Sequence, residues 1–415
     1  MLINNIGVLA GIGSDKRFLR GHEMDSVKTL ENAWILIRDG KIEDFGKMDS
    51  MPDTFGMVEV VDAEGGMVMP AFCDSHTHIV YPESRGGEFL DKINGLSYEE
   101  IAARGGGILN SADRLAEMPE NTLFEVSMER VREVMSMGTG ALEIKSGYGL
   151  SLESELKMLR VVARIAEAVP IVVRATFLGA HAVGRAYAGR QGEYVDHIVR
   201  DMLPAVAAQG IARFVDVFCD KGFFTPDETD RILEAAAKYG LRPKIHGNEL
   251  DVSGGVEVAV KHNALSVDHL ERAGHEQLKL LGESPTCATM LPGASFFLGM
   301  PYGDALGAIE HDNILALASD FNPGSSPSGD MRFVWALGCI KMRLTPAQAF
   351  NAVTVNGAYA MGVSDQVGTI RRGNRAQLIV TRSVAEPNRH NDATAILTEI
   401  PYRYTRPWIS RIINN

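Results

Sequence analysis

The feature that most constrains the fold is a regular alternation of short apolar runs with longer amphipathic segments between residues 67 and 323. The short runs predict buried strands, and segments such as 152–169 and 227–240, with apolar residues three and four apart, predict helices. Eight successive strand–helix units favour a (β/α)8 TIM-like barrel. A doubly wound open sheet is the alternative, but no glycine-rich dinucleotide loop follows the first strand. The predicted strands are 67–74, 140–146, 171–179, 214–220, 241–247, 264–270, 286–293 and 314–320.

Both ends of the chain are rich in predicted strands. Asp39-Gly40 lies between two apolar alternations at 33–38 and 41–45, which predicts a hairpin. Strand-like runs return after the helical segment 345–362, and they would complete the N-terminal sheet if they joined it. We therefore predict a small discontinuous β-sandwich domain, 1–66 and 363–415, beside a barrel domain, 67–362. The C-terminal runs are 367–373, 376–382 and 407–413.

Charge and composition limit the partners. Lys and Arg number 41 against 53 Asp and Glu, so the net charge is −12, and no basic run offers a surface for nucleic acid or an anionic membrane. No secretory leader or long apolar segment is recognisable, so we expect a cytoplasmic protein that does not enter membranes. The four cysteines form no CxxC pair, which predicts free thiols rather than disulfides or a thiolate zinc site.

Several metal-binding or acid–base residues follow predicted strands, where (β/α)8 barrels carry catalytic groups. The first strand ends in Asp-Ser-His76-Thr-His78, and residues two apart on an extended segment face the same way. The fifth strand ends in His246-Gly-Asn-Glu249, the sixth in Asp-His269 and the eighth in Ser-Asp320. Each alone could be a buried polar residue with ordinary partners. However, four of the chain's 11 histidines lie at these strand ends, which favours a shared site.

Three imidazoles and a carboxylate suit one divalent ion, Zn²⁺ or Fe²⁺, with a further position for water. Such an ion lowers the pKa of bound water, which permits attack on a carbonyl. Glu249 and His269 are then available for proton transfer and carbonyl polarisation, so the sequence predicts metal-assisted hydrolysis. The predicted ligands are His76, His78, His246 and Asp320.

Together, these motifs and the β-rich ends resemble the amidohydrolase superfamily. Within it, nearly the whole chain is similar to the imidazolonepropionase family, which opens the ring of 4-imidazolone-5-propanoate to give N-formimidoyl-L-glutamate in histidine degradation. The most specific pair of motifs is SGYG and DFNPGSSP. The stretches that carry the resemblance are 84–89, 104–109, 143–150, 177–183, 244–251, 268–270, 291–299 and 319–327.

The resemblance implies roles for individual residues. Glu249, His269 and Asp320 would act at the attacked carbonyl, and Arg85 would hold the propionate of an anionic heterocyclic substrate in a bidentate pair. The other implied substrate contacts are Tyr148, His181, Asn322, Gly324 and Ser325.

The resemblance also bears on the number of metal ions. Two-metal relatives carry a carboxylated lysine on the fourth strand, whereas Lys145 lies on the second, which favours a single ion.

Gly105-Gly106-Gly107 lacks the lysine of a phosphate loop and predicts a tight or mobile loop near the pocket.

Two other functions stay open. A deaminase of the same superfamily would use the same groups on a ring, and it would release ammonia. A non-catalytic scaffold is the second alternative, although such proteins typically lose ligands and all four are present here. A homodimer is the expected assembly.

Overall fold

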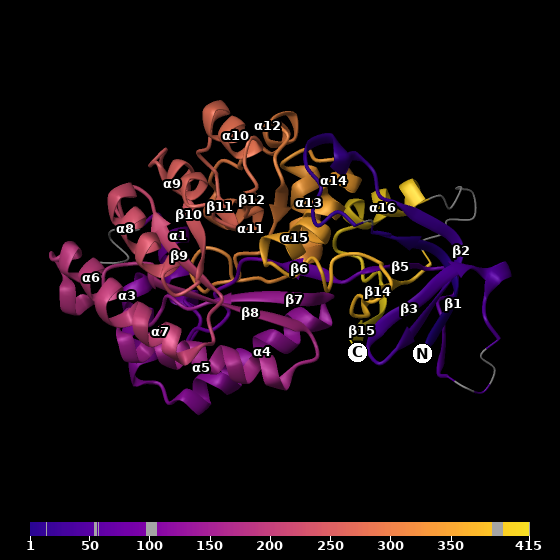
Figure 1. The fold of residues 1–415 in the computed structure, drawn as a ribbon, viewed down its shortest axis with the longest axis horizontal. Helices are drawn as coiled ribbons and strands as arrows, with labels where there is room; N and C mark the ends of the chain where they lie inside the picture. The colour runs from indigo at the N-terminus through magenta and orange to yellow at the C-terminus, as the bar shows by residue number, and fades with distance from the viewer. Residues whose placement is uncertain (14, 54–55, 57, 97–105, 384–392, 415) are drawn as a thin grey trace.

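Two sheets dominate the molecule: an eight-stranded parallel barrel and a seven-stranded mixed sheet beside it (Figure 1). The computed structural model describes the chain except residues 14, 54–55, 57, 97–105, 384–392 and 415. The predicted combination of a (β/α)8 barrel with a small β domain built from both termini is confirmed, and among the described residues that domain contains one mixed sheet where a sandwich was predicted. The boundaries of the two predicted domains stay a prediction.

The barrel strands are neighbours in chain order, and all of them pair in parallel. The seam between the last strand and the first is bridged just beyond their carboxyl ends. There, the His78 amide donates to the Phe321 carbonyl at 2.9 Å and the Asp320 amide donates to the His76 carbonyl at 3.0 Å. Closure of the barrel therefore occurs among predicted site residues. The strands are β6 Phe72–Asp74, β7 Thr139–Lys145, β8 Val172–Ala180, β9 Phe214–Cys219, β10 Arg242–Gly247, β11 Ser266–His269, β12 Cys287–Met290 and β13 Leu315–Leu317.

Helices cover the outside of the barrel (Figure 1). The two helices predicted from periodicity are present as α5 and α8, and each begins at a side-chain cap. Ser151 accepts from the Ser154 amide, and Thr225 forms a capping box with Glu228 ahead of Pro226. The helices are α1 Gly86–Ile93, α3 Gly107–Glu117, α4 Glu120–Ser136, α5 Leu152–Ala168, α6 Gln191–His197, α7 Leu203–Gln209, α8 Pro226–Ala237, α9 Gly255–Lys261, α10 His275–Gly282, α11 Pro292–Leu298, α12 Ala305–Glu310, α13 Met331–Ile340, α14 Pro346–Val353, α15 Val355–Ala360 and α16 Ala393–Tyr402.

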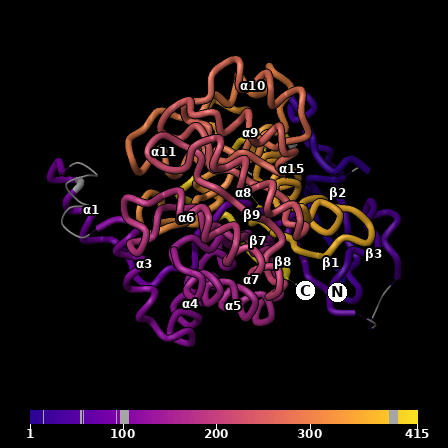
Figure 2. Tube along the Cα trace, turned by 60° about the vertical axis from the view of Figure 1, so that its left-hand side comes forward, coloured from indigo at the N-terminus to yellow at the C-terminus, as the bar shows by residue number. Residues whose placement is uncertain are grey.

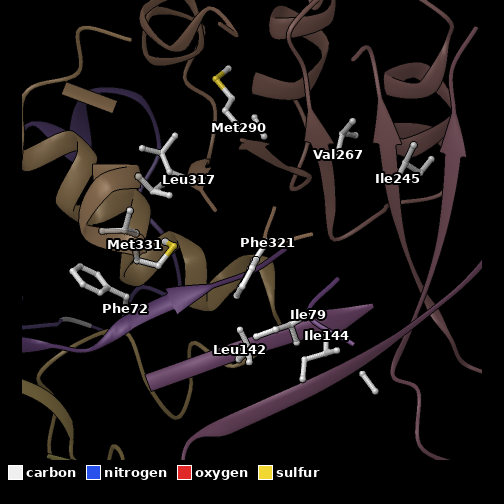
Figure 3. Packing of buried hydrophobic residues seen from close by; sticks show 14 of the residues in the cluster. Phe72, Ile79, Leu142, Ile144, Ile245, Val267, Met290, Leu317, Phe321 and Met331 are labelled. Carbon is white, nitrogen blue, oxygen red and sulfur yellow. The ribbon is translucent and has the colours of Figure 1, made fainter. Parts of the chain in front are cut away.

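The two faces of the barrel strands differ in chemistry. Leu142, Ile144 and Val267 belong to the large apolar cluster that joins strands to helices (Figure 3). Their neighbours in sequence, Glu143 and Lys145, are also fully buried but point into the barrel, because their charged ends meet groups from other strands there. The alternation of a strand therefore separates an apolar outer layer from a polar interior.

The second sheet combines strands from both ends of the chain, and the two termini lie close together in both views (Figures 1 and 2). Strand β14 pairs antiparallel with β5, with Leu378 opposite Pro70. The predicted hairpin is present between β2 and β3, and Asp39 and Gly40 both have positive φ, as a type I′ turn requires. The strands are β1 Leu2–Ala10, β2 Thr29–Arg38, β3 Lys41–Lys47, β4 Val60–Asp62, β5 Met67–Pro70, β14 Gln377–Thr381 and β15 Ile409–Asn414.

Two predicted strands differ in the structure. The run 67–74 is divided between the two sheets: the Ala71 amide donates to the Gln377 carbonyl of the small sheet, and the Phe72 amide donates to the Gly138 carbonyl beside β7. The run 367–373 is not a strand, since its only ladder contact is a bridge between Ile370 and Ile12. Across the part of the chain that the structure describes, none of the helices is both long and apolar enough to span a membrane.

Candidate active site

The predicted site residues gather around one cavity of about 640 Å³ at the carboxyl ends of the barrel strands. His76 lies beneath it, fully buried. Apolar side chains complete the wall, including Phe218 and Phe223, whose rings stack at 3.9 Å. The predicted residues that line the cavity are His78, Arg85, Tyr148, His181, His246, Glu249, His269, Asp320, Asn322, Gly324 and Ser325.

Four donor atoms converge on the floor of the cavity. His78 Nε2 lies 3.2 Å from His76 Nε2 and 3.3 Å from His246 Nε2. Asp320 Oδ1 lies 3.5 Å from the Nε2 atoms of both His76 and His78. The other ring nitrogens of two histidines point away from this centre: His76 Nδ1 donates to Asp268 at 2.6 Å, and His246 Nδ1 donates to Asp216 at 3.0 Å.

This donor set fits a divalent metal ion. Because Asp268 and Asp216 take the Nδ1 protons, the Nε2 atoms of His76 and His246 carry lone pairs, and both of these atoms lie close to His78 Nε2. Burial lowers the pKa of His76, His78 and His246 well below the ordinary value, so all three are neutral, as metal binding requires. Spacings near 3.3 Å are those of donors about 2.0–2.1 Å from one tetrahedral ion.

Glu249 and His269 form a second group at the cavity wall. His269 Nε2 lies 3.5 Å from Glu249 Oε2, and His269 Nδ1 lies 3.5 Å from Glu271 Oε2. Burial opposes the charge of His269, but the carboxylates of Glu249 and Glu271 outweigh it and raise the pKa of the imidazole. Burial raises the pKa of Glu249. The pair can therefore hold and exchange protons close to the four-donor cluster.

The loop that carries Glu249 is held by Asp220, at the end of β9. Asp220 Oδ2 accepts from the Glu249 amide at 2.8 Å and the Leu250 amide at 2.9 Å, and Oδ1 accepts from the Asp251 amide at 3.2 Å. A buried carboxylate that receives several backbone donors fixes the path of the chain around it. Asp220 therefore sets the position of Glu249.

Arg85 reaches the cavity from the segment before α1. Its Nη2 pairs with Glu88 at 2.5 Å, and Glu88 in turn accepts from the Gly107 amide at the start of α3 at 3.0 Å. A Cβ atom at Gly324 would lie 2.4 Å from Arg85 Nη1, so a larger residue there would force the guanidinium to shift from this position. Of the three glycines at 105–107, Gly105 lies outside the described residues.

The remaining predicted substrate contacts differ in how much of each side chain is already engaged. The side-chain amide of Asn322 forms hydrogen bonds within its own loop. It donates to the Asp320 carbonyl and Ser325 Oγ and accepts from two backbone amides. Ser325 Oγ donates to Asp320 Oδ2 at 3.1 Å, which orients that carboxylate. Burial lowers the pKa of His181 to about 4, and its Nδ1 donates to the Gly147 carbonyl at 2.9 Å. His181 Nε2 is therefore an acceptor, and Tyr148 is its neighbour, with ring centres 5.5 Å apart.

Sequence reasoning did not identify Asp216, Asp220 or Glu271 as parts of the site. Asp216 lies in the middle of β9, and the rule used to find the site covers only residues at the carboxyl ends of strands. A charged residue inside an otherwise apolar run such as FVDVFC was the available signal, because a buried strand tolerates a charge only beside a partner.

We predict that Asp220→Ala frees the loop after β10 while the barrel stays folded. Loss of hydrogen bonds to a carboxylate should speed amide exchange at Glu249 and Leu250 by about tenfold or more. Hydrogen exchange followed by mass spectrometry measures this directly. Asp201→Ala, which removes an exposed carboxylate that pairs with His197, is the control. Unchanged exchange across 248–252 in Asp220→Ala would contradict this role.

Comparisons with known proteins agree with this geometry. The Amidohydrolase family model matches residues 67–400. An imidazolonepropionase from Flavobacterium johnsoniae is 50% identical over 365 residues, covering 88% of this chain and 89% of that protein. An imidazolonepropionase from Christiangramia forsetii is 48% identical over 386 residues, covering 92% and 93%.

Solved structures show the same fold at low sequence identity. A mutant of atrazine chlorohydrolase from Arthrobacter aurescens, complexed with zinc and atraton, has a TM-score of 0.74 at 14% identity and covers 99% of this chain and 93% of its own. Guanine deaminase from E. coli has a TM-score of 0.70 at 14% identity and covers 99% and 97%. The motifs, the barrel and the close curated relatives lead to one conclusion: the chain belongs to the amidohydrolase family and, within it, to the imidazolonepropionases.

Proposed function

We propose that this protein hydrolyses the ring carbonyl–nitrogen bond of 4-imidazolone-5-propanoate to give N-formimidoyl-L-glutamate. The single observation that carries the proposal is a cavity with the donor atoms of His76, His78, His246 and Asp320 at its floor and Arg85 at its wall, in a chain 50% identical to an imidazolonepropionase. The cluster suits the attacked ring, and the arginine suits the carboxylate tail of the substrate.

We further propose that His76, His78, His246 and Asp320 hold one divalent ion, Zn²⁺ or Fe²⁺. When bound, such an ion supplies a Lewis acid and a water molecule of lowered pKa. Lys145 is not a candidate bridge to a second ion, because its Nζ already contacts carboxylates of Glu143, Asp216 and Asp268 at 2.8, 2.7 and 3.4 Å. A single ion is therefore proposed.

The chain's own residues divide the remaining chemistry. Glu249 takes a proton from the attacking water and returns it to the ring nitrogen as the carbonyl–nitrogen bond breaks. His269, beside it, donates to the carbonyl oxygen as negative charge develops there. Water adds to the carbonyl carbon and the ring carbon–nitrogen bond breaks, so the single ring-opened product carries a new carboxylate, and its formimidoyl nitrogen has gained a proton. Asp320 shares its carboxylate between the donor cluster and Ser325, so it positions the attacking water.

Arg85 reads the propionate tail. A carboxylate that leaves water needs a cation, and a guanidinium can offer two parallel N–H donors. Glu88 holds the guanidinium in place from one side, and Gly324 leaves the other side uncrowded. Tyr148 and His181, and the loop of Asn322, Gly324 and Ser325, would complete the contacts to the polar ring. The partner is thus a small anionic heterocycle, and a cytoplasmic homodimer stays the expected form of the enzyme.

The first test follows the products. Wild type should convert the imidazolone to formimidoyl-glutamate, with loss of the imidazolone absorbance and no free ammonia, and elemental analysis should find one metal ion per chain. His246→Ala, which removes one donor, should lose the ion and the activity together. Stoichiometric ammonia would indicate a deaminase, and two ions per chain or full activity without metal would contradict the proposed site.

The second test separates chemistry from metal binding. Glu249→Gln keeps the shape of the side chain but removes the base, so kcat should fall by about 10² to 10⁴ while the metal content stays at the wild-type level. Steady-state kinetics and elemental analysis of the same preparation provide both numbers. Loss of metal in Glu249→Gln would make Glu249 a ligand and overturn its assigned role.

The third test concerns specificity. Arg85→Ala should lower kcat/KM by about 10² or more, and Arg85→Lys should recover only part of it, because an ammonium cannot make two parallel bonds. An analogue with a neutral amide in place of the propionate supplies the comparison. Wild type should strongly prefer the acid, and Arg85→Ala should be nearly indifferent. Equal preference in the two enzymes would show that Arg85 does not read the carboxylate.

A further inference from the structure

A cluster of five charged side chains lies inside the barrel, below the four donors. We call it the barrel cluster. All five side chains have zero exposed fraction, and they come from strands β7, β9, β10 and β11. Nothing in the proposed chemistry uses them directly. Its members are Glu143, Lys145, Asp216, Lys244 and Asp268.

The two lysines of the barrel cluster have different neighbours. Lys145 Nζ lies 2.7 Å from Asp216 Oδ2 and 3.4 Å from Asp268 Oδ2, so it lies between the two aspartates that hold ligand histidines. Lys244 Nζ pairs with Glu143, donates to the Ser75 carbonyl at 2.8 Å and lies 3.5 Å from Asp268 Oδ2, about as far as Lys145 does. The 2.7 Å contact with Asp216 therefore distinguishes Lys145 from Lys244.

Each aspartate connects Lys145 to one histidine of the donor set. Asp216 uses Oδ2 for Lys145 and Oδ1 for both the backbone amide and Nδ1 of His246, at 3.2 and 3.0 Å. Asp268 directs Oδ2 toward both Lys145 and His76 Nδ1, while Ser266 Oγ donates to its Oδ1 at 2.5 Å. A carboxylate fixed on one side presents its other lone pairs to the imidazole in one direction only.

We propose that Lys145 is a positioning residue that holds Asp216 and Asp268 in the orientation that turns Nε2 of His246 and His76 toward a bound metal ion. The inference rests on the proposed metal site and deepens it. Without the ammonium, Asp216 Oδ2 loses its 2.7 Å partner and faces the carboxylates of Glu143 and Asp268 across a buried space. Carboxylates that share one buried space repel each other strongly because the dielectric constant of the interior is low. Both aspartates should therefore turn away from their histidines.

The decisive variant is Lys145→Met, which keeps an unbranched side chain of similar length and removes the charge. Purified holoenzyme is mixed with a colorimetric chelator, and the release of the metal is followed with time, alongside kcat and thermal unfolding. Loss of such outer partners typically weakens metal binding about 10- to 100-fold, so release from Lys145→Met should be faster by that factor. Lys157→Met is the control, because Lys157 Nζ also has three acceptors, all of them backbone carbonyls of residues that do not line the cavity.

A double variant separates positioning from simple charge balance. Glu143→Gln with Lys145→Met restores the net charge of the barrel cluster, and we expect it to recover thermal stability but still to release metal fast. Slow, wild-type release from Lys145→Met would overturn the proposal, and so would wild-type metal retention in the double variant. The double variant also decides the matter if Lys145→Met alone does not fold. A wild-type protein that holds no metal would instead refute the proposed function.

Discussion

Pairing of buried charge is the constraint on which the rest of this structure depends. The interior of a (β/α)8 barrel is usually filled by branched apolar side chains, but here it contains carboxylates and ammonium groups. An unpaired ion at such a depth costs several kcal/mol, so each of these groups needs a partner from another strand. Those partners exist only when the barrel has its correct closure and register, with Lys244 opposite Asp216 on one side and Ser266 on the other. The charges therefore make the fold and the site interdependent.

The same alternation explains why an apolar core and a charged interior coexist in single strands. In β7, Leu142 and Ile144 face the helices, whereas Glu143 and Lys145 face inward. The outer layer supplies the burial of apolar surface that stabilises the barrel. The inner layer ends at the carboxyl rim, where His246 and Asp320 both line the cavity. Two residues of this rim, His269 and Asp320, have positive φ, which few residues other than glycine adopt.

Much of the site could be predicted because the barrel imposes a simple rule on the sequence. His246 is the second-last residue of β10, and His78 and Asp320 follow strands; parallel strands bring their carboxyl ends to one rim whatever the loops contain. The rule did not reach Asp216, which acts from within a strand, or Asp220, which acts through the backbone amides of another loop. Gly324 shows a third kind of limit, because its approach to Arg85 joins segments more than two hundred residues apart.

The sequence by itself determined the alternation of strands with helices, the parallel barrel and the residues at its rim. Hydrophobic periodicity and the position of a residue at the end of a strand are local properties, so both can be recognised from neighbouring residues in the sequence. Only the tertiary structure decided that the run from Met67 crosses between two sheets at Ala71, and that 367–373 makes one bridge instead of a strand. It also decided which carboxylate orients which histidine. These outcomes depend on distances between segments far apart in the chain, such as the 2.6 Å from Asp268 to His76, and only closure of the barrel sets such distances.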